Sequence, residues 1–208
     1  MKILNCSVAM KVAISSFISL ALVIFTALWT YYVSNEVHSL AVIAKKDGVV
    51  FAQTAQQMEK DVIQIQQWLT DVSATRGQDN LNDGFERAES SYQSFLAGLS
   101  IFEKQYGEVN DKARLEELSR IRQLLDEYYI LGKQMAEAYV EHGPAEGNKS
   151  MKRFDEQAEI LSASLKPFIT YHYNRWINEL ESVSDTMSLL MKGELIVFVL
   201  IAISVITS

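Results

Sequence analysis

The sequence predicts an all-α protein, and three observations carry that prediction. Two prolines and nine glycines among 208 residues favour helix, and almost no segment alternates as a strand does. Two apolar runs, residues 12–33 and 193–208, flank the charged middle of the chain. Between them begins an unbroken heptad repeat, the pattern of a helix that packs on other helices. Its core positions are Val37, Ala41, Ala44, Gly48, Phe51, Ala55, Met58, Val62, Ile65, Leu69, Val72 and Arg76.

The first apolar run predicts a transmembrane helix over residues 12–35. These residues carry no charge and, at about 1.5 Å per residue, are long enough to cross a hydrocarbon core of about 30 Å. A cleaved signal peptide is the alternative. We favour an uncleaved helix because Trp29, Tyr31 and Tyr32 form an interfacial belt and no small-x-small site precedes the heptads. Residues 193–208 predict a second membrane helix, which we expect to be the front part of something longer.

The charges around the first run predict the orientation of the chain. Lys2 and Lys11 precede the run and Glu36 follows it, so the positive-inside bias makes residues 1–11 a cytoplasmic tail. Residues 36–192 then lie outside the cytoplasm and form one extracytoplasmic domain.

Composition and spacing exclude several classes of function. The net charge of -7 comes from an acidic middle, which disfavours nucleic acid as a partner. Cys6 is the single cysteine, so the sequence offers no Cys-based metal site. None of His38, His142 and His172 has a Glu three positions before it, as a di-iron bundle requires, and no Gly-rich phosphate loop is present. We therefore expect no catalytic residues, no cofactor and no metal.

Three glycines, Gly77, Gly107 and Gly143, each close a periodic run and predict helix C-caps. They divide residues 36–192 into four helices, and the short connections predict an up-down-up-down antiparallel four-helix bundle. Beyond the first helix, the predicted core positions are Phe85, Ala88, Tyr92, Phe95, Leu99, Phe102 and Tyr106; then Leu118, Ile121, Leu125, Tyr128, Met135 and Tyr139; then Phe154, Ala158, Leu161, Leu165, Phe168, Trp176, Leu180, Val183, Met187 and Leu190.

Local signals predict where the later helices begin. Asp83 with Glu86 forms a capping-box-like start for the second helix, and Asn110 is a good N-cap for the third. The fourth helix is expected to begin near Asn148 or Ser150 and to be interrupted at Pro167, because proline removes a helix donor.

The four predicted helices differ in length. The first and last exceed forty residues, so we expect them to extend beyond the bundle as a stem next to the membrane. On that stem the core positions are small, at Ala41, Ala44 and Gly48, and a lone helix pair would cover them poorly. A second copy of the chain would cover them, which predicts a homodimer.

This arrangement resembles the sensory portion of bacterial transmembrane chemoreceptors, the methyl-accepting chemotaxis proteins, and is similar to the input domains of sensor histidine kinases. The resemblance rests on a basic tail, a membrane helix that enters a four-helix bundle, and a last helix that feeds a second membrane helix. The segment from Gln64 to Gly77 is similar to a stretch that recurs in such domains. The resemblance implies ligand sensing by a helix displacement, with signalling partners bound through a cytoplasmic part that this chain lacks. A membrane-anchored adaptor without a small ligand is the alternative.

Polar residues at the end of the first bundle helix predict a ligand site for an organic anion or an amino acid. Equal distances from the distal loops put part of the fourth helix at the same level, and an arginine there suits a carboxylate held bidentately. The alternative is an ordinary surface ion pair worth about 0 to 1 kcal/mol. The candidate residues are Gln64, Gln67, Trp68, Asp71, Thr75, Arg76, Lys152 and Arg153.

A second candidate pocket lies just after Pro167, where Phe168, Tyr171, His172 and Trp176 cluster. The simpler interpretation is a kinked helix whose aromatic residues fill the foot of the bundle. The sharper one is an aromatic pocket for a small ligand.

Overall fold

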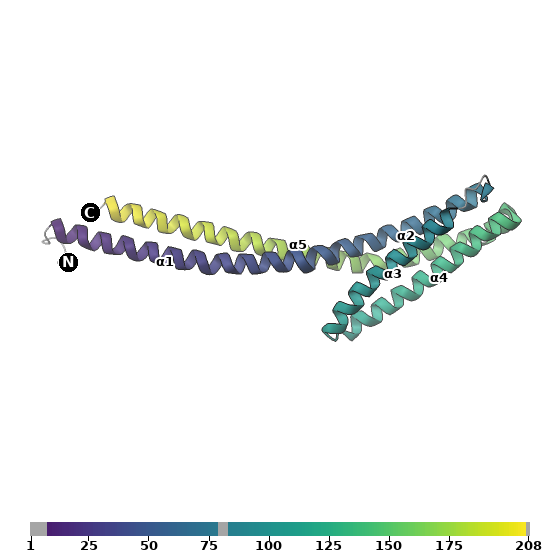
Figure 1. Ribbon diagram of the computed structural model, residues 1–208, viewed down its shortest axis with the longest axis horizontal. Helices are drawn as coiled ribbons and strands as arrows, with labels where there is room; N and C mark the ends of the chain where they lie inside the picture. The colour runs from purple at the N-terminus through teal and green to yellow at the C-terminus, as the bar shows by residue number, and fades with distance from the viewer. Residues whose placement is uncertain (1–7, 79–82, 207–208) are drawn as a thin grey trace. The chain divides into compact units, whose positions relative to one another are not determined.

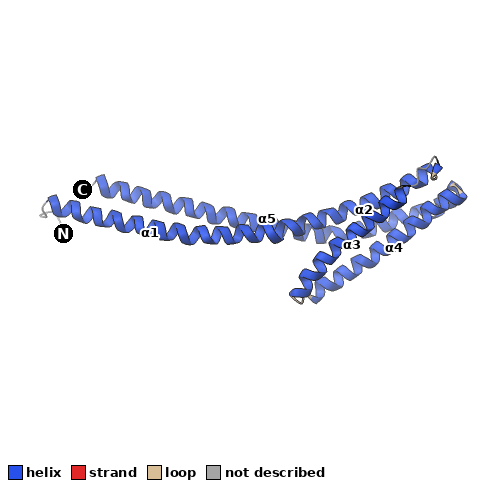
Figure 2. Ribbon diagram, in the orientation of Figure 1, coloured by secondary structure: helices blue, strands red, loops and turns tan. Residues whose placement is uncertain are grey.

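The computed structural model describes residues 8–78 and 83–206 (Figure 2). These residues form helices joined by short turns and contain no strand, so the all-α prediction is confirmed. Lys2, Cys6 and the end of the chain, residues 207–208, lie outside the described residues. The elements, labelled in Figure 1, are α1 (Val8–Ile43), the π-helix η1 (Ala44–Gly48), α2 (Val49–Thr75), α3 (Gly84–Glu108), α4 (Lys112–His142) and α5 (Pro144–Ile206).

Contacts divide the chain into two compact units. The first, here the apolar unit, comprises Met1–Gly48 and Arg175–Ser208, and the second, here the core unit, comprises Val49–Asn174. Helix α5 contributes to both, since it is one helix from Pro144 to Ile206.

The core unit is built from α2, α3, α4 and the first part of α5, which pack against one another around a common hydrophobic core. Large side chains such as Phe95, Tyr128 and Phe154 are fully buried there. The heptad predictions hold for most positions, but they are wrong for Leu180 and Met187, which are exposed. Those confirmed as buried are Ala55, Met58, Val62, Ile65, Leu69 and Val72; Ala88, Phe95, Leu99, Phe102 and Tyr106; Leu118, Ile121, Leu125, Tyr128, Met135 and Tyr139; and Phe154, Ala158, Leu161, Leu165 and Phe168.

Two of the three glycines end their runs as predicted. Gly77 has φ +61° and Gly143 has φ +79°, a region that glycine enters without steric cost. The prediction at Gly107 is wrong, because that residue is helical and α3 continues to Glu108. The left-handed residue of this turn is Asn110, with φ +54°.

The predicted helix starts differ from those observed. Asp111, not Asn110, caps α4, and its carboxylate accepts a hydrogen bond of 3.1 Å from the Arg114 N–H. Asp83 precedes α3 but makes no side-chain cap. Helix α5 begins at Pro144, earlier than expected, since proline tolerates the first helical position, where no N–H partner is needed.

The predicted interruption at Pro167 is also wrong. Helix α5 continues through this residue. The missing N–H leaves the carbonyl of Ala163 without its helical donor, and both Ala163 and Pro167 are exposed, so this carbonyl lies on the solvent side of the helix.

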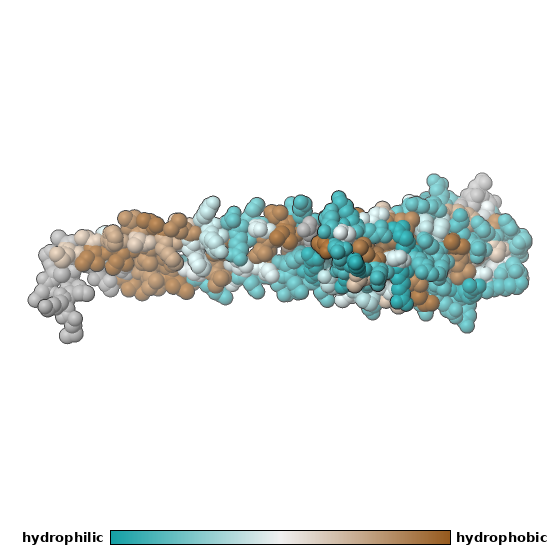
Figure 3. Space-filling view, turned by 90° about the horizontal axis from the view of Figure 1, so that it is seen from below, coloured by the Kyte–Doolittle hydropathy of each residue, from teal (hydrophilic) through white to brown (hydrophobic). Residues whose placement is uncertain are grey.

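The apolar unit contains two stretches long and apolar enough to cross a membrane, within Val12–Thr75 and Pro144–Ile203. In Figure 3 the apolar surface gathers over the start of α1 and the end of α5. Side chains such as Phe17 and Phe198 are about three-quarters exposed, at 73 % and 70 %. Inside the unit, the Thr30 hydroxyl donates to the Glu194 carboxylate at 2.8 Å and so connects α1 to α5.

The α-helix that was predicted to run without a break from the membrane into the bundle is interrupted by the π-helix η1. Ala44 and Gly48 are buried within this one chain, whereas Ala41 is exposed. A Cβ on Gly48 would lie 2.3 Å from the Glu179 carboxylate and 3.1 Å from the Trp176 ring. The premise that a single chain covers these small residues poorly is therefore wrong for Ala44 and Gly48 and holds for Ala41.

Candidate functional site

A surface groove of about 670 Å³ lies between α2 and α5 of the core unit. Residues on one face of α2 supply most of its wall, because positions three and four apart on a helix point the same way. The buried Leu69 and Val72 hold this stretch of α2 against the core. The groove is lined by Ile63, Gln66, Gln67, Trp68, Thr70, Asp71, Ala74, Met151 and Asp155.

Two contacts fix the polar wall of the groove. The Gln66 side-chain amide donates to the Asp155 carboxylate at 3.2 Å, which joins α2 to α5. The guanidinium carbon of Arg87, on α3, lies 4.8 Å from the centre of the Trp68 ring, a cation–π distance. The indole is therefore held in place from one side by a helix that does not line the groove.

The structure brings together three of the eight candidate residues, namely Gln67, Trp68 and Asp71. Among the described residues, the other five lie outside the lining. Gln64 is half-buried in α2, and the Thr75 hydroxyl donates to the backbone carbonyl of Asp71 at 3.0 Å.

The three predicted cations are exposed. Arg76 lies beside the turn between α4 and α5, since a Cβ on Gly143 would be 3.7 Å from its guanidinium nitrogen. Lys152 pairs with Glu156 at 3.6 Å, and Arg153 follows it on α5. Within the groove itself the charged lining residues are the carboxylates Asp71 and Asp155. The groove wall therefore complements an ammonium or amide better than an isolated anion.

The second candidate pocket is occupied by its own side chains. Phe168 and His172 are buried in the core unit, with ring centres 4.8 Å apart, and Tyr171 packs on His172 at 5.1 Å. Phe102 of α3 lies 4.6 Å from the His172 ring. Trp176 belongs to the apolar unit. Phe102, Phe168 and His172 are therefore part of the core, whereas Tyr171 covers His172 from the exposed side.

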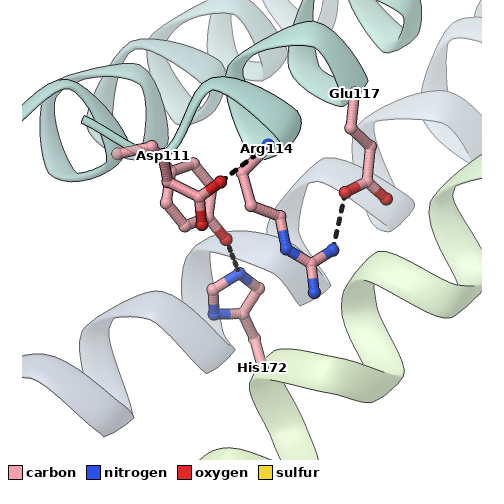
Figure 4. A network of polar contacts seen from close by, with 5 residues as sticks. Asp111, Arg114, Glu117 and His172 are labelled. Atoms are coloured by element: carbon pink, nitrogen blue, oxygen red, sulfur yellow. Dashed lines mark hydrogen bonds and ion pairs between the residues drawn. The ribbon is translucent and has the colours of Figure 1, made fainter. Parts of the chain in front are cut away.

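One polar network accompanies this aromatic core, and Figure 4 shows it from close by. The Tyr106 hydroxyl lies 2.7 Å from Nε2 of His172. Arg114 donates to Glu117 at 2.6 Å, and its guanidinium lies 4.2 Å from the centre of the Tyr171 ring. Burial raises the pKa of Tyr106 to about 12, although the charge of Arg114 opposes the rise.

Sequence reasoning missed one buried acid, Asp61 of α2, which is 1 % exposed. Its Oδ1 accepts a hydrogen bond of 2.8 Å from the side-chain amide of Gln57. Burial raises the pKa of this carboxyl, opposed by hydrogen bonds from Ser94 and Gln57 and by the charge of Lys60. The i, i+4 spacing of Gln57 and Asp61 was the available signal, but it is also common on exposed helix faces.

Residues 8–78 and 83–206 contain no group of three or more His, Cys, Asp or Glu side chains that could hold a metal ion. Comparison with protein-family models, with curated proteins and with solved structures finds no match. Neither finding assigns a reaction or a ligand to the chain.

Proposed function

We propose that this chain is the extracytoplasmic ligand-sensing input domain of a bacterial transmembrane signalling receptor, a chemotaxis transducer of the inner membrane. The single observation that carries the proposal is the continuity of α5. Its first part places Phe154, Leu161 and Phe168 in the hydrophobic core, and its last part is apolar enough to cross a membrane. A helix built in this way connects a packed domain to the membrane without an intervening loop.

We further propose that the four packed helices form the up-down-up-down bundle. Support comes from contacts between helices. Tyr92 of α3 donates to Asp126 of α4, while Glu103, later in α3, pairs with Arg122, earlier in α4. This order is that of an antiparallel pair. The Tyr128 ring of α4 stacks on Phe154 of α5 at 4.8 Å, early in α5.

The bundle offers a physical route for a signal. A ligand that contacts both α2 and α5 favours whichever packing of the two helices binds it better. Packed helices shift by about 1 to 2 Å in such transitions, and a continuous helix carries the shift along its axis. In a homodimer the helices of both copies would shift in this way.

The groove favours an amino acid among the predicted ligands. Its ammonium group complements the carboxylates of Asp71 and Asp155. Its carboxylate would need a cation outside the groove lining, and Arg76, Lys152 and Arg153 are the candidates. A simple organic anion has no ammonium group, so it could make only the contact between its carboxylate and one of these cations.

The test is a hybrid receptor that joins residues 1–208 to the cytoplasmic part of a chemotaxis transducer. The activity of the kinase that the transducer controls is measured in isolated membranes, in the presence of each of a panel of amino acids and organic acids. We expect at least one amino acid to change the activity, and Trp68→Ala or Asp71→Asn to abolish the change. Gln123→Ala, exposed on α4, is the matched control and should respond normally. If the assembled hybrid activates the kinase but no compound alters it, the ligand-sensing proposal fails.

Two alternative functions would rest on the same observation, the continuity of α5. The input domain of a sensor histidine kinase would use the same continuous helix with a different output, and a structural anchor or adaptor would use it with no ligand. The coding sequence after Ser208 separates a receptor from an anchor: a linker followed by long heptad helices would establish a receptor, whereas an immediate stop would favour the anchor.

A further inference from the structure

A groove of about 720 Å³ lies between α1 and α5 of the apolar unit. Side chains such as Val23 and Phe198 make most of its wall apolar. Among the described residues that line it, the polar ones are Thr26, Thr30 and Glu194, and Glu194 alone is charged. The groove is therefore an apolar surface that carries one acidic group.

The groove has a polar end and an apolar end. Within the apolar unit, Gly48 lies against Glu179. Thr30, earlier in the chain, meets Glu194, which is later in the chain, so the two segments are antiparallel. Thr30 and Glu194 therefore mark one end of the groove, and Ile201 lies about 10 Å further along α5.

The polar end lies at the level expected for the membrane surface. A Cβ on Gly193 would lie 3.1 Å from Nε1 of Trp29, so this indole packs beside the residue that precedes Glu194. Tryptophan is enriched where acyl chains meet headgroups, and the predicted interfacial belt begins at Trp29. From this level the groove extends to Val23 and Ile201, toward the predicted hydrocarbon core.

The charge of Glu194 has no counter-charge within the part of the chain that the structure describes. Its carboxylate accepts a hydrogen bond of 2.8 Å from Thr30, which joins the helices but leaves the negative charge in place. Lys192, two positions earlier, lines a different groove. An amide oxygen could accept the same hydrogen bond without a charge, whereas a charge at membrane depth is costly unless it is paired. The carboxylate therefore suits a cationic ligand.

We propose that this groove binds a phospholipid with a primary-ammonium headgroup, phosphatidylethanolamine. The ammonium group pairs with Glu194, and an acyl chain lies along Ala27, Val23 and Phe198. A primary ammonium donates hydrogen bonds to a carboxylate, whereas the trimethylated headgroup of phosphatidylcholine has no N–H to donate. The proposal rests on residues 12–35 and 193–208 lying in a membrane, and it does not depend on receptor function.

A lipid fits the surroundings of the groove better than other occupants do. Phe198 is 70 % exposed and Val23 is 51 % exposed, so the wall is open to the acyl chains of a bilayer. A second copy of α1 could cover this wall, but residues 12–35 carry no charge and would leave Glu194 without a cation. A small free amine would match the carboxylate but would not cover the apolar part of the groove.

The test places the full chain in nanodiscs that contain phosphatidylethanolamine and phosphatidylcholine in equal amounts and with the same acyl chains. A trace of either lipid carries a photoreactive diazirine in its acyl chain, and mass spectrometry maps the labelled residues. We expect the ethanolamine probe to label residues 23–30 and 194–201 at least about threefold more than the choline probe does. Glu194→Gln should remove this preference, because the amide oxygen still accepts from Thr30 but carries no charge.

Glu181→Gln is the matched control, since Glu181 is exposed on α5 and lies outside the groove lining, and it should keep the preference. Equal labelling by the two probes, a preference that survives in Glu194→Gln, or an equal loss in Glu181→Gln would overturn the proposal. So would groove residues that neither probe labels, because a second chain or another occupant would then cover them. If Glu194→Gln does not enter the nanodiscs, the wild-type comparison decides alone. None of these outcomes bears on kinase control, which the hybrid receptor measures.

Discussion

Gly132 of α4 lies where two helices approach its backbone. A Cβ there would be 2.4 Å from Phe154 and 2.6 Å from Leu69, both fully buried. Gly132→Ala should therefore destabilise the protein by about 1 to 3 kcal/mol, because a packed core must shift to admit the methyl group. The thermal midpoint of the full chain in detergent, followed by circular dichroism, measures the loss.

The control is Gly107→Ala in α3. Gly107 is helical and nothing lies within 4 Å of the Cβ it would carry. This change should be neutral or stabilise by up to about 1 kcal/mol, because alanine favours helix over glycine. If both variants lose stability equally, close packing at Gly132 is not the reason.

Asp61 gives a prediction with a defined dependence on pH. Burial raises the pKa of its carboxyl above the ordinary 3.8, so the fold holds this proton more tightly than the unfolded chain does. Its contribution to stability is complete below about pH 3.8 and is lost as the pH rises through the raised pKa. Asp61→Asn should therefore raise the thermal midpoint at pH 7 and lose this advantage near pH 4.

Glu59→Gln is the control for Asp61. Glu59 is exposed on the same helix, so removal of its charge should change the midpoint little at either pH. A gain in Glu59→Gln as large as that in Asp61→Asn would assign the effect to net charge rather than to burial.

Burial of individual residues could be predicted where it depends only on the periodicity within one helix. Positions such as Phe95 and Leu125 repeat every three or four residues, and the periodicity alone assigns them to the core. Pairs such as Tyr106 with His172 could not be predicted, since they depend on the register between helices 66 residues apart in the chain. The same reason explains why only part of the groove lining could be predicted. Gln67, Trp68 and Asp71 lie on one helix and could be grouped by their spacing, whereas the positions of Lys152 and Arg153 depend on how α5 packs against α2.

At the scale of the element, local sequence predicts that a helix begins near an aspartate but not whether that aspartate caps the helix. Asp83 and Asp111 both precede helices, and the sequence signal favoured Asp83 because Glu86 follows it. In the structure Asp111 makes the cap, and Asp83 instead pairs with Arg87 at 2.7 Å. Both arrangements are available to an aspartate at a helix start, and neighbouring contacts decide between them.

Asp111→Ala should destabilise the protein by about 1 kcal/mol, the usual cost of an N-cap that accepts from the backbone. Asp83→Ala removes an ion pair whose side chains are 55 % and 57 % exposed, and such pairs contribute about 0 to 1 kcal/mol. Thermal midpoints of the two variants should therefore rank Asp111→Ala as the more costly. The reverse order would mean that the capping box predicted at Asp83 operates in solution.

At the scale of the whole molecule, the proposed topology places residues 36–192 outside the cytoplasm. An alkaline-phosphatase fusion near Gly107, exposed at the end of α3, should be active, because that enzyme requires the oxidising periplasm. Fusions at the same site to a reporter that works only in the cytoplasm should be inactive. The opposite pair of results would reverse the orientation that Lys2, Lys11 and Glu36 predict.

The dimer prediction can now be directed at one residue. Ala44 is 1 % exposed within the single chain, so a cysteine there would be shielded from any partner. Ala41 is exposed one turn earlier, on the face that the heptad assigns to pairing. In a Cys6→Ser background, Ala41→Cys should crosslink between chains under mild oxidation in membranes.

Ile43→Cys is the matched control, since it is exposed on the same helix but points about 200° away. Faster crosslinking at Ile43 than at Ala41 would place the paired face elsewhere or leave the chain without a parallel partner.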